Sequence, residues 1–289
     1  MCKDLTICIP AYNEEQAIGD TLRALKAAVP DAEIIVVDDG SQDATATVAA
    51  VVPEVKVLSH ERNRGYGAAL KTAMRNASRK LVLWYDADRQ HRVEDVHRIV
   101  QPVLDGGNDV VIGVRKNSLR DNPERNPGKL ALKILAELIA RDKVPDVNSG
   151  LRCFRSEVIK KYLHLLPDGF SASTTSTLLM MKRGYRVGYV DIVTHPRLGK
   201  STVRIFRDGL RTLQLMIRIL VLFEAFGFFT ALSLLQIIPG GVYGLYMALT
   251  TGRGVPTLAA TIVMSGIFTF FMGILCDQIT ELRKEKFEE

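Results

Sequence analysis

The chain has 289 residues, of which 38 are Lys or Arg, 32 are Asp or Glu and 47% are hydrophobic. These figures exclude an intrinsically disordered or low-complexity protein, and the length predicts about two domains, or one domain with an appendage. The formal net charge is +6, and the basic residues gather near the apolar C-terminal segments, so we expect anionic lipid rather than nucleic acid as the partner.

Short apolar runs alternate with helical patterns in the first 115 residues. Strands are predicted at 5–9, 33–37, 55–58, 81–85 and 109–113. Helices are predicted at 13–28, with Asn13 as N-cap, and at 66–77 and 93–104. This alternation is typical of an α/β fold with a parallel sheet covered on both faces. Ligands of such sheets bind beyond the carboxyl ends of the strands.

The next 80 residues continue the mixed pattern. A polar loop is predicted at 116–126 and a helix at 128–141. A second loop at 146–150 precedes a short strand, helices at 156–164 and 174–183, and a strand at 186–192.

The C-terminal part has the composition of a membrane anchor. No charged residue occurs from Ala225 to Gly252 or from Gly254 to Cys276, and each run exceeds the ~20 apolar residues that cross a bilayer. We expect spans at 226–249 and 256–276; the alternative is a buried helical hairpin in a soluble core. Basic residues flank the spans on both outer sides, whereas the intervening loop has only Arg253. This asymmetry predicts that both ends lie in the cytosol.

An amphipathic helix is predicted just before the spans. It extends from 202 to 220 and places on one face Arg204, Arg207, Arg211 and Arg218. We expect it to lie on the bilayer surface; the alternative is a solvated helix on a globular domain. The predicted organisation is a cytosolic catalytic domain (1–200), a juxtamembrane helix (201–222), two transmembrane helices (223–280) and a cytosolic tail (281–289). The chain would then be an integral protein of the bacterial inner membrane or an equivalent membrane.

Carboxylates gather where two buried strands are predicted to end. Asp38 and Asp39 follow one strand, and Asp86 and Asp88 follow another. Two carboxylates that face the same way repel each other unless a cation lies between them, and oxygen ligands favour Mg²⁺ or Mn²⁺. Gln90 and His91 can complete the shell; the alternative for all of these residues is a helix cap or a polar loop.

Other common catalytic signatures are missing. The sequence has neither a GxGxxG nor a GxxxxGK[ST] loop, and its histidines and serines form no recognisable triad. Residues 63–67 form a Gly-rich loop that opens a helix, which suits either an anion or a tight turn. The four cysteines form no CxxC pair and no metal-binding spacing, so we interpret them as reduced and structural.

Taken in order, the motifs resemble those of the family 2 inverting glycosyltransferases. They are Pro10-Ala11-Tyr12-Asn13-Glu14, Val37-Asp38-Asp39-Gly40-Ser41, Asn63-Arg64-Gly65, Asp86-Ala87-Asp88-Arg89-Gln90-His91 and Gly113-Val114-Arg115. With the two predicted spans, the chain looks most like the polyisoprenyl-phosphate glycosyltransferases, the dolichol-phosphate-mannose-synthase group and its bacterial relatives. Residues 149–154 and 197–201 are similar to two further segments of that group.

The resemblance implies a GT-A (Rossmann-like) fold and assigns roles to residues. The nucleotide of a nucleotide diphosphate sugar would be lined by Pro10, Tyr12, Glu14, Asp38 and Asp39, although Asp38 can instead buttress its loop. The metal on the donor diphosphate would be held by Asp86, Asp88 and Gln90. The phosphate of a membrane polyprenyl phosphate would meet Arg115, Arg125, Lys129, Arg197, Lys200 and Ser201. The alternative for Arg115 is a surface ion pair with a carboxylate.

The implied reaction explains why no catalytic His is evident. A polyprenyl phosphate is ionised near neutral pH, so it attacks without a general base and inverts the anomeric carbon. Other readings stay open at this point: a non-catalytic, nucleotide-sugar-binding membrane subunit, a family 2 transferase that acts on a sugar hydroxyl, and a nucleotidyltransferase. A processive polysaccharide synthase should carry a Gln-x-x-Arg-Trp segment, but the only Trp is Trp84 in a predicted strand. The identity of the donor and the oligomeric state, with a homo-oligomer possible, are not specified.

Overall fold

The protein is described here by a computed structural model that covers residues 3–115, 127–194, 214, 217–252 and 254–285. The chain divides into two compact units, Met1–Ile205 and Phe206–Glu289. The predicted polar loop 116–126 and most of the predicted amphipathic helix 202–220 lie outside the described residues.

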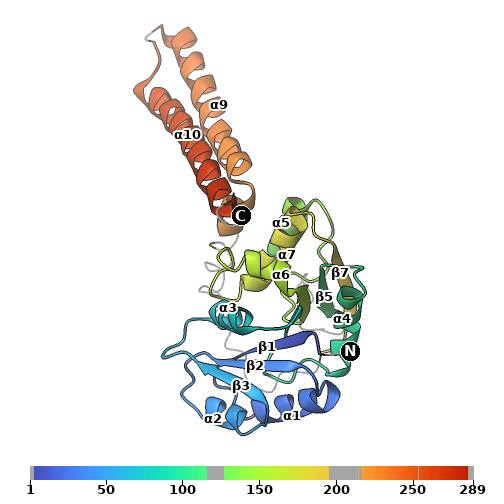
Figure 1. Cartoon of the computed structure of the whole chain (residues 1–289). Coiled ribbons are helices and arrows are strands. Elements are labelled where there is room, and N and C mark those ends of the chain that lie inside the picture. Colours follow the sequence, from blue (N-terminus) through green and yellow to red (C-terminus); the bar gives the residue numbers. More distant parts are fainter. Residues whose placement is uncertain (1–2, 116–126, 195–213, 215–216, 253, 286–289) are drawn as a thin grey trace. The chain divides into compact units, whose positions relative to one another are not determined.

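The first unit is built on one seven-stranded sheet, in the order β3-β2-β1-β4-β6-β5-β7 (Figure 1). The strands are β1 (Leu5–Ala11), β2 (Glu33–Asp38), β3 (Val55–Ser59), β4 (Leu81–Trp84), β5 (Val110–Arg115), β6 (Arg152–Arg155) and β7 (Val187–Ile192). All neighbouring pairs are parallel except those that involve β6, which runs antiparallel to both β4 and β5. The sheet is therefore mixed rather than purely parallel, because β6 inserts between two strands that precede it in the chain.

Helices cover both faces of this sheet, as expected. They are α1 (Ile18–Ala28), α2 (Thr45–Ala50), α3 (Tyr66–Asn76), α4 (Glu94–Leu104), α5 (Pro127–Ala140), α6 (Ser156–Lys161) and α7 (Ala172–Lys182). In Figure 1, α1 and α2 lie on one side of the strands, and α3, α6 and α7 lie on the other. Alternate residues of β1, namely Leu5, Ile7 and Ile9, join the core on the side of α1 and α4.

One local prediction was wrong, and one helix was not predicted. Helix α1 begins at Ile18 rather than near Asn13. Asn13 has φ +55°, and its amide donates to Ser41 Oγ (2.9 Å) while its Oδ1 accepts from the Gln42 amide (2.9 Å). The side chain therefore joins two loops instead of capping a helix. Helix α2 was not predicted, because its six residues are too few to show a period.

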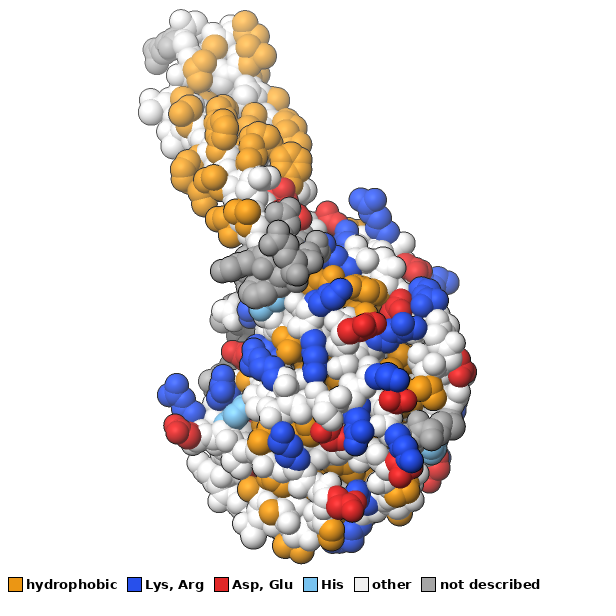
Figure 2. All heavy atoms as spheres, in the orientation of Figure 1, with side chains coloured by type: hydrophobic (Ala, Val, Ile, Leu, Met, Phe, Trp, Pro, Cys, Tyr) orange, Lys and Arg blue, Asp and Glu red, His pale blue; other side chains and the backbone are white. Residues whose placement is uncertain are grey.

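The second unit is a pair of long apolar helices, α9 (Ala225–Thr251) and α10 (Thr257–Glu285). Both are long and apolar enough to cross a membrane, with mean hydropathies of 1.6 and 2.1. Figure 2 shows hydrophobic side chains over most of the visible face of this hairpin. Between the helices, Gln236 accepts from Ser265 (2.9 Å) and donates to Thr269 (3.3 Å), which satisfies polar groups that lipid cannot satisfy.

Candidate active site

The predicted nucleotide-binding and metal-binding residues follow strands that end at one edge of the sheet. Ala11 at the end of β1 pairs with Asp38 at the end of β2, and Cys8 of β1 pairs with Trp84 at the end of β4. These three strands are parallel, so the loops that leave their carboxyl ends are neighbours. Such an edge is where ligands of α/β sheets bind.

The loop after β1 is held to the loop after β2 by a series of short bonds. The amide of Glu14 donates to Thr45 Oγ1 (2.8 Å), and Glu15 Oε2 accepts from the Ala44 amide (3.0 Å). Pro10 is buried within β1, whereas the Tyr12 side chain is 43% exposed at the rim of the edge. Of the predicted nucleotide residues, Tyr12 thus has the surface best placed for stacking on a ligand.

Asp38 and Asp39 are both buried and accept hydrogen bonds from backbone amides of nearby loops. Asp39 accepts from the amides of Arg64 (2.9 Å) and Gly65 (2.7 Å), and its Oδ1 lies 2.6 Å from Nδ1 of His60. Asp38 accepts from the Ser41 amide (3.1 Å). Both carboxylates therefore position loops around the site, and a nucleotide contact for either one stays a prediction.

Asp86 lies at the centre of a small polar cluster. Its Oδ1 accepts from the Tyr66 hydroxyl (3.0 Å), and its Oδ2 lies 3.2 Å from Nε2 of His91. Burial acts to raise the pKa of Asp86, but the bonds from His91 and Tyr66 outweigh it, so the pKa lies below its ordinary value. Burial, together with the Asp86 charge, raises the pKa of Tyr66 well above its ordinary value, so its hydroxyl stays protonated.

His91 supports Asp86 from a buried position. Its side chain is 3% exposed, and its backbone carbonyl accepts from the Tyr85 hydroxyl (2.7 Å). Because a carboxylate only accepts, the proton of a neutral His91 belongs on Nε2. Its Nδ1 then has no hydrogen-bond partner among the described residues.

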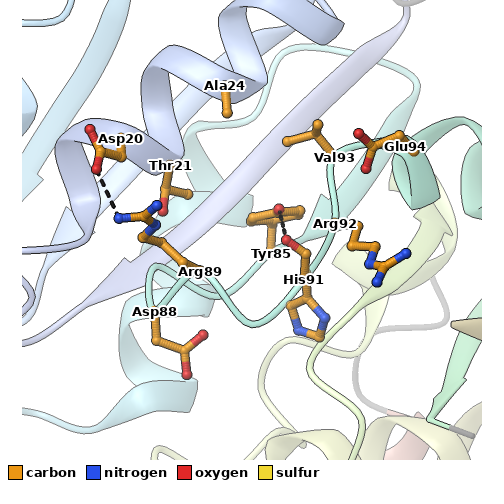
Figure 3. Close-up of a pocket in the computed structure, with 10 residues that line it drawn as sticks. All are labelled: Asp20, Thr21, Ala24, Tyr85, Asp88, Arg89, His91, Arg92, Val93 and Glu94. Atoms are coloured by element: carbon orange, nitrogen blue, oxygen red, sulfur yellow. Dashed lines mark hydrogen bonds and ion pairs between the residues drawn. The ribbon is translucent and has the colours of Figure 1, made fainter. Parts of the chain in front are cut away.

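Asp88 is half-buried and lies on the turn after Asp86. Its Oδ1 accepts from the Gln90 amide (3.1 Å), and Arg89 between them has φ +62°. This turn borders a hollow of about 620 Å³ that is lined by three residues of α1 and by Tyr85, Asp88, Arg89 and residues 91–94. In Figure 3, Arg89 extends to its ion pair with Asp20, whereas the Asp88 carboxylate points away from that pair.

The donors at this turn fit a hard divalent cation that also binds substrate oxygens. Asp86 and Asp88 supply carboxylate oxygens, and Gln90 can supply an amide oxygen, the ligand types that Mg²⁺ and Mn²⁺ prefer. Within the described ranges, no group of three or more His, Cys, Asp or Glu residues is arranged to hold a metal. Such an ion would therefore need further ligands, which the oxygens of a diphosphate can provide.

Arg115 at the end of β5 forms a two-bond ion pair with Asp146. Its Nε and Nη2 donate to the two carboxylate oxygens at 2.7 and 2.9 Å, and the side chains are 21% and 12% exposed. Strand β6 lies between β4 and β5, and Trp84 and Ile112 both pair with Arg152, so these two positions lie about 10 Å apart across the sheet. The charge of Arg115 nevertheless contributes to the lowered pKa of Asp86.

Arg152 fixes a loop beside the site, and no role was predicted for it from the sequence. It is fully buried, lies over the ring of Trp84 and donates to Ser149, Ser173, Ser176 and Thr177. Burial lowers its pKa to about 10. These bonds tie the loop before β6 to α7, and that loop places Gly150 against the Asp86 carboxylate. The run of Ser and Thr at 173–177 was the feature of the sequence that could have indicated a buried polar partner such as Arg152.

The remaining residues of the acceptor prediction are not placed. Arg125, Arg197, Lys200 and Ser201 lie outside the described residues, as does the side chain of Lys129 in α5.

The chain matches two known family profiles. Glycosyl transferase family 2 matches residues 6–163, and the GtrB C-terminal hairpin matches residues 227–282. An uncharacterized protein of Methanocaldococcus jannaschii is 38% identical over 66% of this chain and 81% of its own length. A UDP-N-acetylglucosamine–dolichyl-phosphate N-acetylglucosaminyltransferase of Methanococcus voltae is 29% identical over 66% of this chain and 86% of its own length. A dolichyl-phosphate hexose transferase of Haloferax volcanii is 29% identical over 71% of this chain and 89% of its own length.

Solved structures share the fold. A complex of glucosyl-3-phosphoglycerate synthase from Mycobacterium tuberculosis with Mn²⁺, UDP and glucosyl-3-phosphoglycerate has a TM-score of 0.59. The similarity covers 75% of this chain and 78% of that one at 22% identity, so it supports the GT-A-like architecture alone. The profile over residues 6–163 extends across the site at the sheet edge and more than half of the sequence, and the chain therefore belongs to glycosyl transferase family 2.

Proposed function

We propose that the protein transfers a sugar from a nucleotide diphosphate sugar to a membrane polyprenyl phosphate, with inversion at the anomeric carbon. The observation that carries this proposal is the presence, in one chain, of the Asp86 and Asp88 turn at the sheet edge and of two helices apolar enough to cross a membrane. The names of the dolichyl-phosphate transferases from Methanococcus voltae and Haloferax volcanii support it.

In this mechanism Asp86, Asp88 and Gln90 would hold Mg²⁺ or Mn²⁺ against the donor diphosphate. The ion supplies positive charge that stabilises the leaving diphosphate. His91 and Tyr66 keep the Asp86 carboxylate ionised and oriented, as their bonds to it support. Tyr12 would stack on the nucleotide from the rim, and the Asp39 network would shape the wall beside it.

The acceptor needs orientation more than activation. Its phosphate is already charged at neutral pH, so the protein has no proton to remove from the nucleophile. Arg115 has a planar fork of donors that suits a phosphate, and it would exchange the Asp146 carboxylate for the acceptor when the lipid arrives. Arg125, Lys129, Arg197, Lys200 and Ser201 are further proposed contacts.

The proposed location follows the charge asymmetry along the chain. Helices α9 and α10 would cross the membrane, residues 1–200 and the C-terminal tail would lie in the cytosol, and residues 201–222 would lie at the bilayer surface. The acceptor's phosphate would then reach the site from the headgroup layer.

The test is a transfer assay with the full-length protein in lipid vesicles. UDP-N-acetylglucosamine, UDP-glucose and GDP-mannose are supplied with undecaprenyl or dolichyl phosphate, Mn²⁺ or Mg²⁺, and with or without EDTA. Sugar on the lipid phosphate that disappears with EDTA is the expected result. Metal-dependent binding of a nucleotide sugar without transfer would favour the binding subunit. Transfer only to a free saccharide would favour the hydroxyl-specific transferase.

A further inference from the structure

Phe170 is the most exposed large hydrophobic residue of the described part of the first unit. Its side chain is 82% exposed, whereas the neighbouring Leu165 and Leu166 are buried. It lies in the loop that connects α6 to α7. A single exposed apolar side chain is common on a protein surface, so its position relative to the site decides whether it has a role.

The loop that carries Phe170 is fastened to α3 from both sides. The amide of Ala68 donates to the Asp168 carbonyl (3.0 Å), and Lys71 Nζ bonds the Leu166 carbonyl (3.0 Å) and the Asp168 carboxylate (2.5 Å). Gly67 allows this close approach, because a Cβ there would overlap the Pro167 carbonyl. The exposed ring is therefore presented by a fixed backbone.

The Phe170 ring is connected to the proposed metal site through Tyr66. Phe170 stacks on Tyr66 with 5.3 Å between the ring centroids and 19° between the ring planes. The Tyr66 hydroxyl donates to Oδ1 of Asp86 at 3.0 Å. The partly buried Tyr66 ring thus links the carboxylate proposed to hold the metal to the exposed ring of Phe170.

We infer that Tyr66 and Phe170 form a stacking platform for the sugar ring of the donor, an inference that rests on the proposed function. An aromatic face packs well against the C–H face of a pyranose, and Phe170 has no polar atom that would prefer another ligand. The diphosphate lies at the metal, and the sugar is bonded directly to it. In an inverting displacement the acceptor attacks from the opposite side of the sugar. The sugar therefore lies nearer than the prenyl chain to a platform that starts at Asp86.

The experiment compares each nucleotide sugar with its own nucleoside diphosphate, so that only the sugar differs. Binding of UDP, UDP-N-acetylglucosamine, UDP-glucose, GDP and GDP-mannose in Mn²⁺ is measured by calorimetry on the full-length protein in nanodiscs. Phe170→Ala should weaken nucleotide-sugar binding roughly tenfold and leave binding of the diphosphate unchanged. Phe170→Tyr, which restores a ring, should regain most of the affinity. Val51→Ala, at an apolar side chain that is 75% exposed, is the matched control and should change neither affinity.

Two results would overturn the platform. One is unchanged binding of both ligands to Phe170→Ala together with a raised KM for the polyprenyl phosphate, which would place the ring against the lipid. The other is an equal loss of affinity of Phe170→Ala for the nucleotide sugar and for its nucleoside diphosphate. Failure of the proposed function looks different, since the unaltered protein would then show no EDTA-sensitive transfer of sugar to the polyprenyl phosphate in vesicles, whatever its binding of nucleotide sugars.

Discussion

Gly150 lies so close to Asp86 that a Cβ at position 150 would overlap the Asp86 carboxylate. The antiparallel pairing of β6 with β4 brings the loop before β6 to the end of β4. A larger residue at position 150 would therefore displace the Asp86 carboxylate from its bonds with Tyr66 and His91.

Gly150→Ala should therefore displace Asp86 and weaken the metal site. We expect the Mn²⁺ concentration for half-maximal transfer to rise roughly 10- to 100-fold, the usual effect of disturbing the groups that orient a metal ligand. Gly107→Ala is the matched control, because a Cβ there meets no atom closer than 3.5 Å. An unchanged Mn²⁺ dependence of Gly150→Ala would show that Asp86 is not a ligand.

Asp88→Asn should abolish transfer with little effect on folding. Loss of a charged ligand opposite the leaving diphosphate should lower kcat roughly a hundredfold or more. Asp88 is half-exposed, and removal of one of two repelling carboxylates should not lower the Tm. Asp105→Asn, at an exposed carboxylate on the far end of α4, is the control. Activity of Asp88→Asn at saturating Mg²⁺ and Mn²⁺ would contradict the metal assignment.

The alternation of strands and helices in the sequence was enough to predict the strand ends that carry Asp38 and Asp86. Those elements are set by local apolar runs whose lengths and periods are visible without the fold. The insertion of β6 between β4 and β5 was not predictable, because strand order depends on contacts between distant segments. An ion pair of Arg115 with a carboxylate was an alternative, but the same reason hid its partner Asp146. It also hid the bond of Tyr66 to Asp86 and the stack of Phe170 on Tyr66.

The ion pairs of Asp109 give the catalytic unit a pH-dependent stability. The bonds from Arg186, which outweigh burial, and the charge of Arg155 lower the pKa of Asp109 below its ordinary value of 3.8. A carboxyl group with a lowered pKa in the folded state stabilises that state above its unfolded pKa, and the contribution is lost as the pH falls through the folded value.

Asp109→Asn should therefore lower the Tm of the protein by a few degrees at most between pH 5 and 8, for a fall of about 1 kcal/mol or less in the free energy of unfolding, because solvent screens the pairs with Arg155 and Arg186. The difference from the unaltered protein should shrink as the pH falls below 4 and should vanish below the folded pKa of Asp109, where both proteins lack the charge. The measurement is a series of thermal unfolding curves at several pH values that report the unfolding of the first unit, residues Met1–Ile205. A difference that is constant down to acid pH would assign the effect to packing rather than to the charge.

The proposed topology makes opposite predictions for the two ends of the hairpin. In a variant with Cys2 and Cys276 changed to Ser, a cysteine at position 253 should react with a membrane-impermeant maleimide added outside intact cells. A cysteine at position 284 should react only after lysis. Buried Cys8 and Cys153 should stay unlabelled in both cases. External labelling at 284 would contradict the cytosolic placement of the catalytic unit.

The last prediction separates two roles of Arg115. Arg115→Ala removes the proposed clamp on the acceptor phosphate, so transfer should fall roughly tenfold to a hundredfold, the equivalent of one or two charged hydrogen bonds. It also leaves Asp146, only 12% exposed, without its bidentate partner, which should lower the Tm. The double variant Arg115→Ala/Asp146→Asn removes both charges and should recover the Tm without recovering transfer. Donor binding should stay intact in both variants, since the nucleotide residues follow other strands. If the double variant regains activity along with stability, Arg115 serves the fold through Asp146 and not the acceptor.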